Sequence, residues 1–143
     1  MAKNLIGTLV LLALLAGCAS MGPGAQDTQA VRIEGTPGKA VIYLVRTHPD
    51  LSYLTAQVTI GDTLIGSTYA GTYYRVEVPA GRHKLSGTVQ DNGSLTIDVQ
   101  ADRVYFVQHS VSGSWRATNP HSFFKVIDET RGRAAMVGAE RKG

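Results

Sequence analysis

One serine and one lysine have a spacing that could support catalysis. Ser122 and Lys125 are three positions apart, and on a helix this spacing brings a lysine base beside a serine nucleophile. The alternation around them predicts a strand instead, in which positions three apart point to opposite faces. The companion motifs Ser-Asp-Asn and Lys-Thr-Gly are absent from the sequence. A serine acyl-enzyme is therefore not predicted.

The histidines are the next candidates, and no two of them have the short spacing that builds a zinc pair on one element. They are His48, His83, His109 and His121. His83 shares the parity of Leu85, which predicts a histidine at the edge of the core with its ring nitrogens bonded to backbone. We keep His83 and His109 as candidate pocket residues, and we predict no metal site and no cofactor.

The carboxylates and the glycine-rich segment indicate no catalytic set either. A glycosidase needs two carboxyl groups roughly 5 to 10 Å apart across a sugar site, and no pattern here specifies such a pair. Residues 35–39 have two residues between their glycines where a phosphate-binding loop has four, and Ala40 stands where the magnesium-binding hydroxyl belongs. We therefore predict no catalytic residues. A hydrolase in which His83 or His109 meets a carboxylate or hydroxyl is the least favoured alternative.

The aromatic residues are better candidates for a binding surface. Alternation assigns to the core Tyr43, Tyr74, Phe106 and either Phe123 or Phe124. The aromatics near predicted loops or on polar faces, with one neighbouring arginine, form the candidate ligand or partner surface: Tyr53, Tyr69, Tyr73, Trp115 and Arg116. Exposed aromatics can stack on a sugar or anchor a protein partner. The alternative is that Trp115 covers an open end of the fold.

The start of the chain is unusually rich in leucine. Six of the twelve leucines fall within the first seventeen positions, and residues 5–15 form a run of eleven apolar or small residues after Lys3. That run is shorter than the roughly 18 to 20 residues a membrane-spanning helix needs. The pattern predicts an export signal over residues 1–17.

Leu15-Ala16-Gly17-Cys18 closes this run and resembles the lipobox of bacterial lipoproteins. The resemblance implies cleavage before Cys18, a diacylglyceryl group on its thiol and a further acyl chain on its amine. Two or three chains anchor a protein stably where one is marginal. The resemblance also implies an outer-membrane anchor facing the periplasm, because Ala19 replaces the aspartate associated with inner-membrane retention. The alternative is an ordinary secretory signal with an incidental cysteine.

Charge and cysteine content exclude two classes of protein. Removing residues 1–17 leaves 126 residues with thirteen basic and eleven acidic side chains, because only Lys3 is lost from the fourteen basic ones. A net charge of +2 does not indicate a nucleic-acid-binding protein. One cysteine excludes a disulfide framework.

Composition divides the mature chain into three segments. Residues 18–38 carry repeated glycine and proline and predict a flexible tether of about 25 Å root-mean-square length, within which Val31 and Ile33 alternate as in a short edge strand. Residues 39–138 form the predicted β-domain. Residues 139–143 form a basic tail, for which attraction to anionic lipid or to the carboxylates of peptidoglycan is a hypothesis.

Alternating apolar residues and turn signals predict eight short strands. Their ranges are 41–45, 54–60, 63–66, 73–78, 82–89, 95–99, 104–107 and 123–127. Asp128 and Glu129 suit a helix start, and residues 131–139 predict one or two helical turns that Gly132 weakens. The spacing indicates an all-β fold, an antiparallel two-sheet β-sandwich of seven or eight strands with a short C-terminal helical segment. A small open barrel is the main alternative.

Four short motifs resemble, in order and spacing, a domain-of-unknown-function family of bacterial periplasmic lipoproteins. They are Tyr43-Leu44-Val45-Arg46, Gly71-Thr72-Tyr73, Pro79-Ala80-Gly81-Arg82-His83 and the segment Ala101-Asp102-Arg103-Val104-Tyr105-Phe106-Val107. The third is also similar to the turn of PEGA domains. The resemblance implies an all-β domain on a lipid anchor and transfers no catalytic residues. It departs from the family at Asp102, where the family tends to have glycine.

These observations favour a non-enzymatic, lipid-anchored envelope protein whose β-domain contacts a protein partner or supports envelope organisation. The first alternative is a carbohydrate or peptidoglycan binder that uses Trp115 and the neighbouring tyrosines. The second is a periplasmic hydrolase.

Overall fold

Strand β1 (Ala40–Arg46) lies at the centre of the larger of two sheets, and all seven of its residues are buried. Its sequence is apolar at both parities, as expected for a strand covered on both faces. Ile42 and Leu44 point into the core between the two sheets, which we call the inner core. Val41 and Tyr43 point into a second cluster on the opposite face, the outer core.

The computed structural model describes residues 31–87, 93–113 and 121–143. The elements after β1 are β2 (Ala56–Ile60), β3 (Thr63–Thr68), β4 (Thr72–Val78), β5 (Gly81–Gly87), β6 (Ser94–Val99), β7 (Val104–Ser112), β8 (His121–Ile127), α1 (Glu129–Met136) and β9 (Glu140–Lys142). They form a five-stranded sheet of order β8-β7-β1-β4-β9 and a four-stranded sheet of order β3-β2-β5-β6. The prediction of an all-β sandwich with a short C-terminal helix is confirmed.

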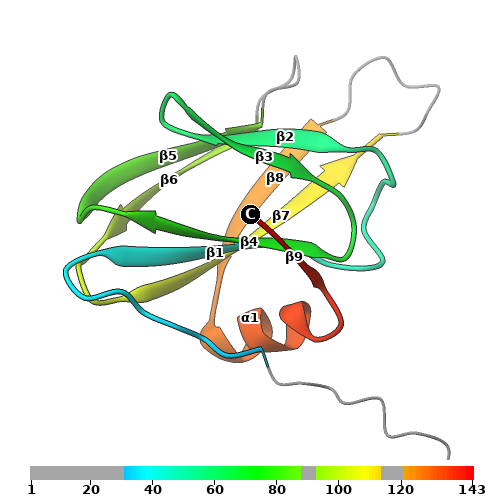
Figure 1. Cartoon of the computed structure of the whole chain (residues 1–143). Helices are drawn as coiled ribbons and strands as arrows, with labels where there is room; N and C mark the ends of the chain where they lie inside the picture. The colour runs from blue at the N-terminus through cyan, green and yellow to red at the C-terminus, as the bar shows by residue number, and fades with distance from the viewer. Residues whose placement is uncertain (1–30, 88–92, 114–120) are drawn as a thin grey trace, which may run out of the picture.

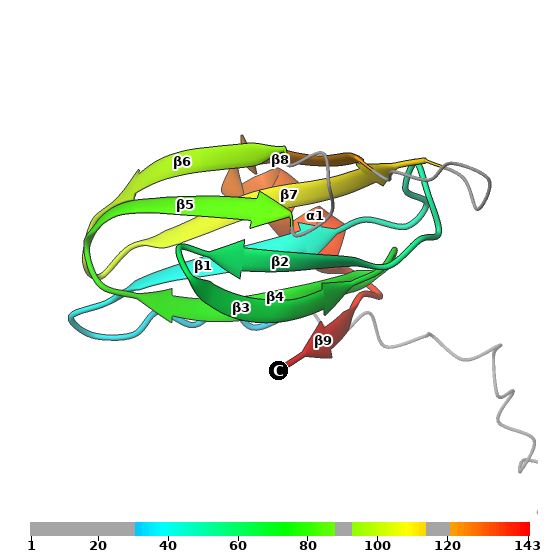
Figure 2. The same ribbon diagram turned by 90° about the horizontal axis from the view of Figure 1, so that it is seen from above.

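The two sheets face each other across the inner core, and α1 covers the other face of the five-stranded sheet (Figure 1, Figure 2). Most pairings are antiparallel, as predicted. β1 with β7 and β4 with β9 are parallel. The chain between β1 and β7 runs through the four-stranded sheet, which supplies the long connection that parallel neighbours need.

The chain ends of the domain differ from the prediction. Residues 139–143, expected to be a basic tail, include β9, which pairs with β4 and whose Glu140 N–H donates to the Gly71 carbonyl at 2.8 Å. Val31 and Ile33 form no edge strand and pack against the outer core instead. Residues 31–38 of the expected tether therefore lie on the domain. Packing against the outer core removes the apolar side chains of Val31 and Ile33 from water, which is favourable.

At the Asp102 turn a non-glycine residue adopts a left-handed backbone conformation. Asp102 has a φ of 60°, in the left-handed region that aspartate tolerates better than most residues. Its carboxylate accepts from the Gly38 N–H at 2.7 Å, and its own N–H donates to the Lys39 carbonyl at 2.8 Å. Both bonds tie the start of β1 to the start of β7.

Helix α1 begins as predicted, because the Asp128 side chain accepts from the Arg131 N–H at 2.9 Å. Gly132 weakens the helix by propensity, yet it is buried where a Cβ would overlap the Phe106 ring. The glycine therefore lets the helix approach the sheet closely. No helix in the described part of the chain is long and apolar enough to cross a membrane.

Replacing Gly132 with alanine tests whether close packing or helix propensity dominates. Propensity alone would stabilise by about 1 kcal/mol, whereas forcing a methyl group into a packed core costs about 1 to 3 kcal/mol. We expect net destabilisation in urea unfolding. Gly35→Ala is the control, because the nearest atom to its added Cβ is 3.9 Å away. A Gly132→Ala protein more stable than the wild type would contradict the close approach.

Candidate functional site

Arg46 is a fully buried charged side chain at the end of β1. The alternation that sends Ile42 and Leu44 inward also sends Arg46 into the space between the sheets. Its Nε lies 2.5 Å from Asp50 Oδ2. Its Nη1 donates to the Thr68 carbonyl at 3.0 Å, and its Nη2 donates to the Ser52 carbonyl at 2.6 Å. These bonds satisfy a buried cation that would otherwise be very costly.

The 47–55 loop, which joins β1 to β2, is held by these bonds. Asp50 Oδ2 also accepts from the Val111 N–H of β7 at 3.0 Å, so one carboxylate links the loop to two strands of the five-stranded sheet. Ser52 is buried and its hydroxyl accepts from the Leu54 N–H at 3.1 Å. The loop backbone is therefore fixed at positions 50 and 52.

The same loop holds two large side chains out in solvent. Leu51 is 71% exposed and Tyr53 is 80% exposed, more than any other large hydrophobic side chain among the described residues. They alternate with the inward-pointing Asp50 and Ser52. The Tyr53 ring lies 6.5 Å from the ring of His48. Two apolar groups presented on a fixed backbone make a preorganised contact surface.

Arg46 is the first member of a row of buried polar side chains that continues with Thr68, His109 and Ser122. We call these four side chains the polar row. Thr68 donates its hydroxyl proton to the Ala56 carbonyl at 3.0 Å, so its oxygen accepts from His109 Nδ1–H at 2.9 Å. His109 Nε2 then carries the lone pair that accepts the Ser122 hydroxyl proton at 3.0 Å. The row thus joins β3, β7 and β8.

A serine hydroxyl bonded to an oriented imidazole is the arrangement that activates a nucleophile. Here Ser122 is 2% exposed and His109 is fully buried. Gly87 and Gly93 lie so near that a Cβ on Gly87 would be 2.5 Å from Ser122 Oγ and one on Gly93 would overlap the Ser122 carbonyl. Within the described residues the Ser122 hydroxyl is buried, and its hydrogen bond to His109 links β8 to β7.

His109 is kept neutral by its surroundings. Burial, assisted by the positive charge of Arg46, lowers the pKa of His109 to about 4, and the Asp50 carboxylate opposes this only in part. The imidazole stacks on the Phe124 ring with centroids 4.6 Å apart and planes 9° apart. A second buried cation beside Arg46 is thereby avoided.

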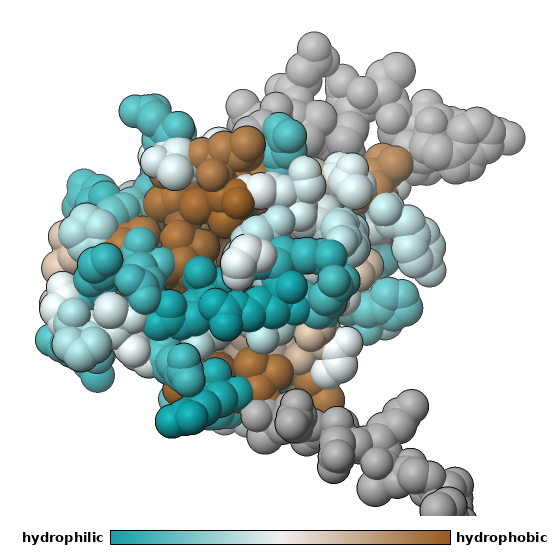
Figure 3. Space-filling view, in the orientation of Figure 1, coloured by the Kyte–Doolittle hydropathy of each residue, from teal (hydrophilic) through white to brown (hydrophobic). Residues whose placement is uncertain are grey.

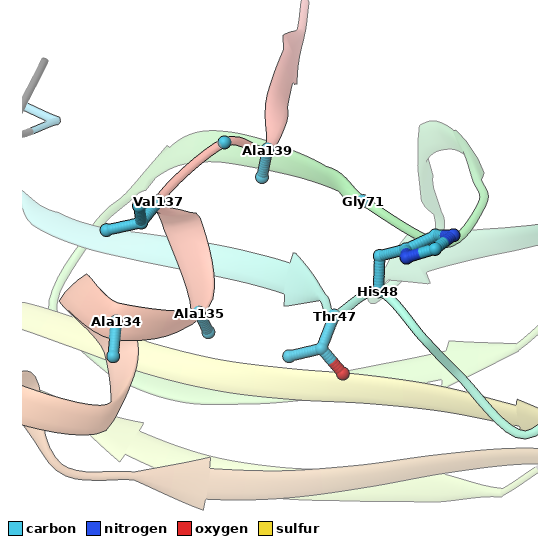
Figure 4. Close-up of a pocket in the computed structure, with 8 residues that line it drawn as sticks. Thr47, His48, Gly71, Ala134, Ala135, Val137 and Ala139 are labelled. Carbon is cyan, nitrogen blue, oxygen red and sulfur yellow. The ribbon is translucent and has the colours of Figure 1, made fainter. Parts of the chain in front are cut away.

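A small hollow adjoins the 47–55 loop, with a volume of about 170 Å³ (Figure 4). Thr47 and His48 line one side, and small residues after the middle of α1 line the other. Figure 4 shows Thr47 and Ala135 facing each other across it. Small-molecule sites usually occupy about 300 to 1,000 Å³, so the hollow is smaller than such a site.

The structure places the predicted aromatic surface in several environments. Tyr53, a candidate surface residue, is exposed. Tyr69 is half-buried, with Lys142 Nζ 5.0 Å from its ring centroid. Tyr73 is wrong as a surface residue: it is 8% exposed in the outer core, because α1 covers the face that its polar neighbours suggested was open. Trp115, Arg116 and the expected lipidation residue Cys18 lie outside the described residues.

The two candidate pocket histidines also differ. His83 is half-buried and its Nε2–H donates to the Pro79 carbonyl at 2.8 Å, which confirms a core-edge histidine bonded to backbone. His109 is not among the residues that line the hollow beside the 47–55 loop and is fully buried in the polar row. Ser122 is buried and Lys125 is exposed on β8, as a strand requires. The described residues contain no group of three or more His, Cys, Asp or Glu side chains that could hold a metal ion.

Sequence reasoning missed the roles of Arg46, Asp50 and Ser52. A signal was present, because Arg46 has the inward parity of Leu44 at the end of an apolar strand and Asp50 follows it by four residues. An inward cation needs a nearby anion. Thr68, Val111 and Ser122 are too distant in sequence to be found in this way.

No protein-family model matches the chain, and no curated protein matches it. The function is therefore argued from the geometry of the chain itself.

Lowering the pH tests the neutral state of His109. Since its folded pKa is about 4 and its ordinary value is 6.5, the unfolded chain takes up a proton that the folded chain does not. The contribution of neutral His109 to the free energy of unfolding is fully present above pH 6.5. About 3 kcal/mol of it is lost as the pH falls to 4, and the loss then levels off. His109→Gln should flatten this slope in urea unfolding.

The titration of Glu77 does not affect the urea unfolding measurements between pH 4.5 and 6.5. Hydrogen bonds from Thr36 and Arg75 lower its pKa to about 2, so its contribution is lost only as the pH falls below its ordinary value of 4.5. Equal slopes for the wild type and His109→Gln between pH 4.5 and 6.5 would contradict the buried neutral imidazole.

Proposed function

We propose that this protein is a non-enzymatic, lipid-anchored cell-envelope protein that contacts a protein partner through the 47–55 loop. The observation that carries the proposal is the display of Leu51 and Tyr53 on a backbone clamped by buried Arg46. A flexible loop would lose conformational entropy on binding, whereas a clamped loop has already lost it in folding.

The two side chains are of the kinds that anchor interfaces. Full burial of a leucine side chain contributes about 1.5 to 3 kcal/mol, and tyrosine is enriched among the residues that dominate binding energy. Asp50 precedes Leu51, and Ser52 lies between Leu51 and Tyr53. Both are already bonded inside the domain. A partner therefore covers apolar surface without having to satisfy a buried charge.

The position of the chain's start is compatible with a lipid anchor on Cys18. Residues 31–38 lie on the outer face of the five-stranded sheet, near α1, and the connection between β1 and β2 lies at one end of the sandwich (Figure 1). An anchor on Cys18 would be joined to the domain at this outer face.

A carbohydrate such as peptidoglycan is the second candidate ligand. The observation that favours it is the exposed Tyr53 ring beside the His48 ring, because sugars stack on exposed aromatic faces. The two candidates differ in what Leu51 contributes, since an aliphatic side chain suits a protein partner better.

Replacing Cys18 with serine tests the anchor. Without a thiol no acyl chain can be attached, so the Cys18→Ser protein should leave the membrane fraction and appear in the periplasmic soluble fraction on immunoblots. Ala19→Ser is the matched control and should stay with the membrane. Unchanged partitioning of Cys18→Ser with lipid would contradict the anchor.

Replacing Leu51 and Tyr53 with serine tests the contact surface. Both side chains are exposed, so the double variant should unfold within about 0.5 kcal/mol of the wild type. In-cell crosslinking should lose its protein adduct. Leu64→Ser, at another exposed leucine (55%), is the control and should keep the adduct.

Two results would count against the partner surface. One is a protein adduct that survives the double substitution. The other is the absence of an adduct in the wild type together with co-sedimentation on purified sacculi that Tyr53→Ser abolishes, which would favour the carbohydrate ligand.

A further inference from the structure

β9 is the shortest strand in the described part of the chain and lies at one end of the five-stranded sheet. Its three residues pair with residues 72–74 of β4. Glu140 and Arg141 are exposed, whereas β1, on the other side of β4, is buried throughout. A short, exposed edge strand opens at a lower free-energy cost than the centre of a sheet.

The salt bridge of β9 lies within the strand. Lys142 Nζ is 2.7 Å from Glu140 Oε1, so this ion pair does not tie β9 to the sheet. Lys142 Nζ also lies 5.0 Å from the ring centroid of Tyr69, in the connection between β3 and β4. Cation–π contacts near the surface are weak. The hold on β9 is therefore mainly its backbone pairing with β4.

Gly138 separates β9 from the fixed end of α1. Met136 is fully buried in the outer core, whereas Val137 is 49% exposed. Gly138 has a φ of 73°, in the left-handed region that favours glycine, and a Cβ there would meet nothing within 4 Å. The chain can therefore change direction at Gly138 while α1 stays on the sheet.

The same segment forms part of the hollow beside the 47–55 loop. Gly138 and Ala139 line it together with Thr47, His48 and other residues. Figure 4 shows the chain from Val137 to Ala139 along the border of the hollow. The volume of about 170 Å³ therefore belongs to the state in which β9 is docked. Movement of this segment away from β4 widens the hollow.

Gly71 connects β9 to the end of β1. Its carbonyl accepts from the Glu140 N–H at 2.8 Å, and its own N–H donates to the Arg46 carbonyl at 2.9 Å. The side chain of Arg46 in turn holds the 47–55 loop through the Ser52 carbonyl. Departure of β9 thus removes a hydrogen bond from the residue that is bonded directly to Arg46.

We propose that β9 is a latch that opens at Gly138 while the rest of the domain stays folded. In the docked state β9 is bonded to Gly71 and borders the hollow. In the open state the hollow is wider and residues 72–74 of β4 are unpaired on that side. The latch therefore sets the shape of the surface beside the 47–55 loop. It is a property of this chain and requires no partner.

Amide hydrogen exchange at low urea concentrations tests the latch in the Cys18→Ser chain. The Glu140 amide should exchange about a hundredfold or more faster than the amides of β1. Its rate should stay constant as urea rises, because a local opening exposes little new surface. The β1 amides should exchange faster with urea, because their exposure requires unfolding of the domain.

Replacing Gly138 with alanine tests the hinge. A non-glycine residue is strained at a φ of 73° and relaxes when β9 opens, so Glu140 exchange should rise about fivefold or more. Gly38→Ala is the matched control. Gly38 has the same φ of 73° and equally open surroundings, but it precedes β1. It should leave Glu140 exchange unchanged.

A single thiol in the hollow tests the widening. In the Cys18→Ser chain, Ala135→Cys places a thiol at a half-buried position that lines the hollow. Adding Glu140→Pro, which removes the N–H that bonds to Gly71, should speed its alkylation by iodoacetamide about fivefold or more. Glu140→Gln keeps that N–H and should not. Ala134→Cys, at an exposed position of the same helix, should react equally in all three backgrounds.

Three results would overturn the inference. Equal urea dependence of the Glu140 and β1 amides would show that β9 opens only when the whole domain unfolds. Glu140 exchange that is no faster in Gly138→Ala than in Gly38→Ala would exclude the hinge. Unchanged alkylation of the Ala135→Cys thiol in Glu140→Pro would show that the hollow does not widen. If Glu140→Pro does not fold, Gly138→Ala takes its place in the alkylation measurement.

Discussion

A buried guanidinium is the constraint on which one end of this domain depends. The Arg46 guanidinium is a charged group, and removing an unpaired cation from water costs several kcal/mol. Strand alternation nevertheless directs it between the sheets, so neighbouring segments must supply acceptors. Asp50, Ser52 and Thr68 do this from the 47–55 loop and from β3. The course of the loop follows from that requirement.

The same requirement extends through the polar row to the far strands. Thr68 gives its carbonyl to Arg46 and its hydroxyl to the contact with His109. His109 must stay neutral beside the guanidinium, and it holds Ser122 on β8. Hydrogen bonds with defined partners thus fix this end of the sandwich, whereas non-directional apolar packing fills the rest of both cores.

The proposed contact surface on the 47–55 loop depends on the same guanidinium. The 47–55 loop offers the side chains of Leu51 and Tyr53 on a backbone whose Ser52 carbonyl and Leu54 N–H are already bonded. Figure 3 shows a further apolar patch on the side of the molecule where β3 and β4 lie.

The sequence by itself determined the elements whose cause is local: the doubly apolar β1, the Asp128 cap, and His83 with its bond to the nearby Pro79. It also determined the sandwich class, because strand periodicity and turn spacing depend on near neighbours. The tertiary structure alone decided the fate of Tyr73, the pairing of β9 and the contact of His109 with Ser122 and Thr68. Each depends on which distant segment covers a face or supplies an acceptor, and periodicity carries no information about that partner.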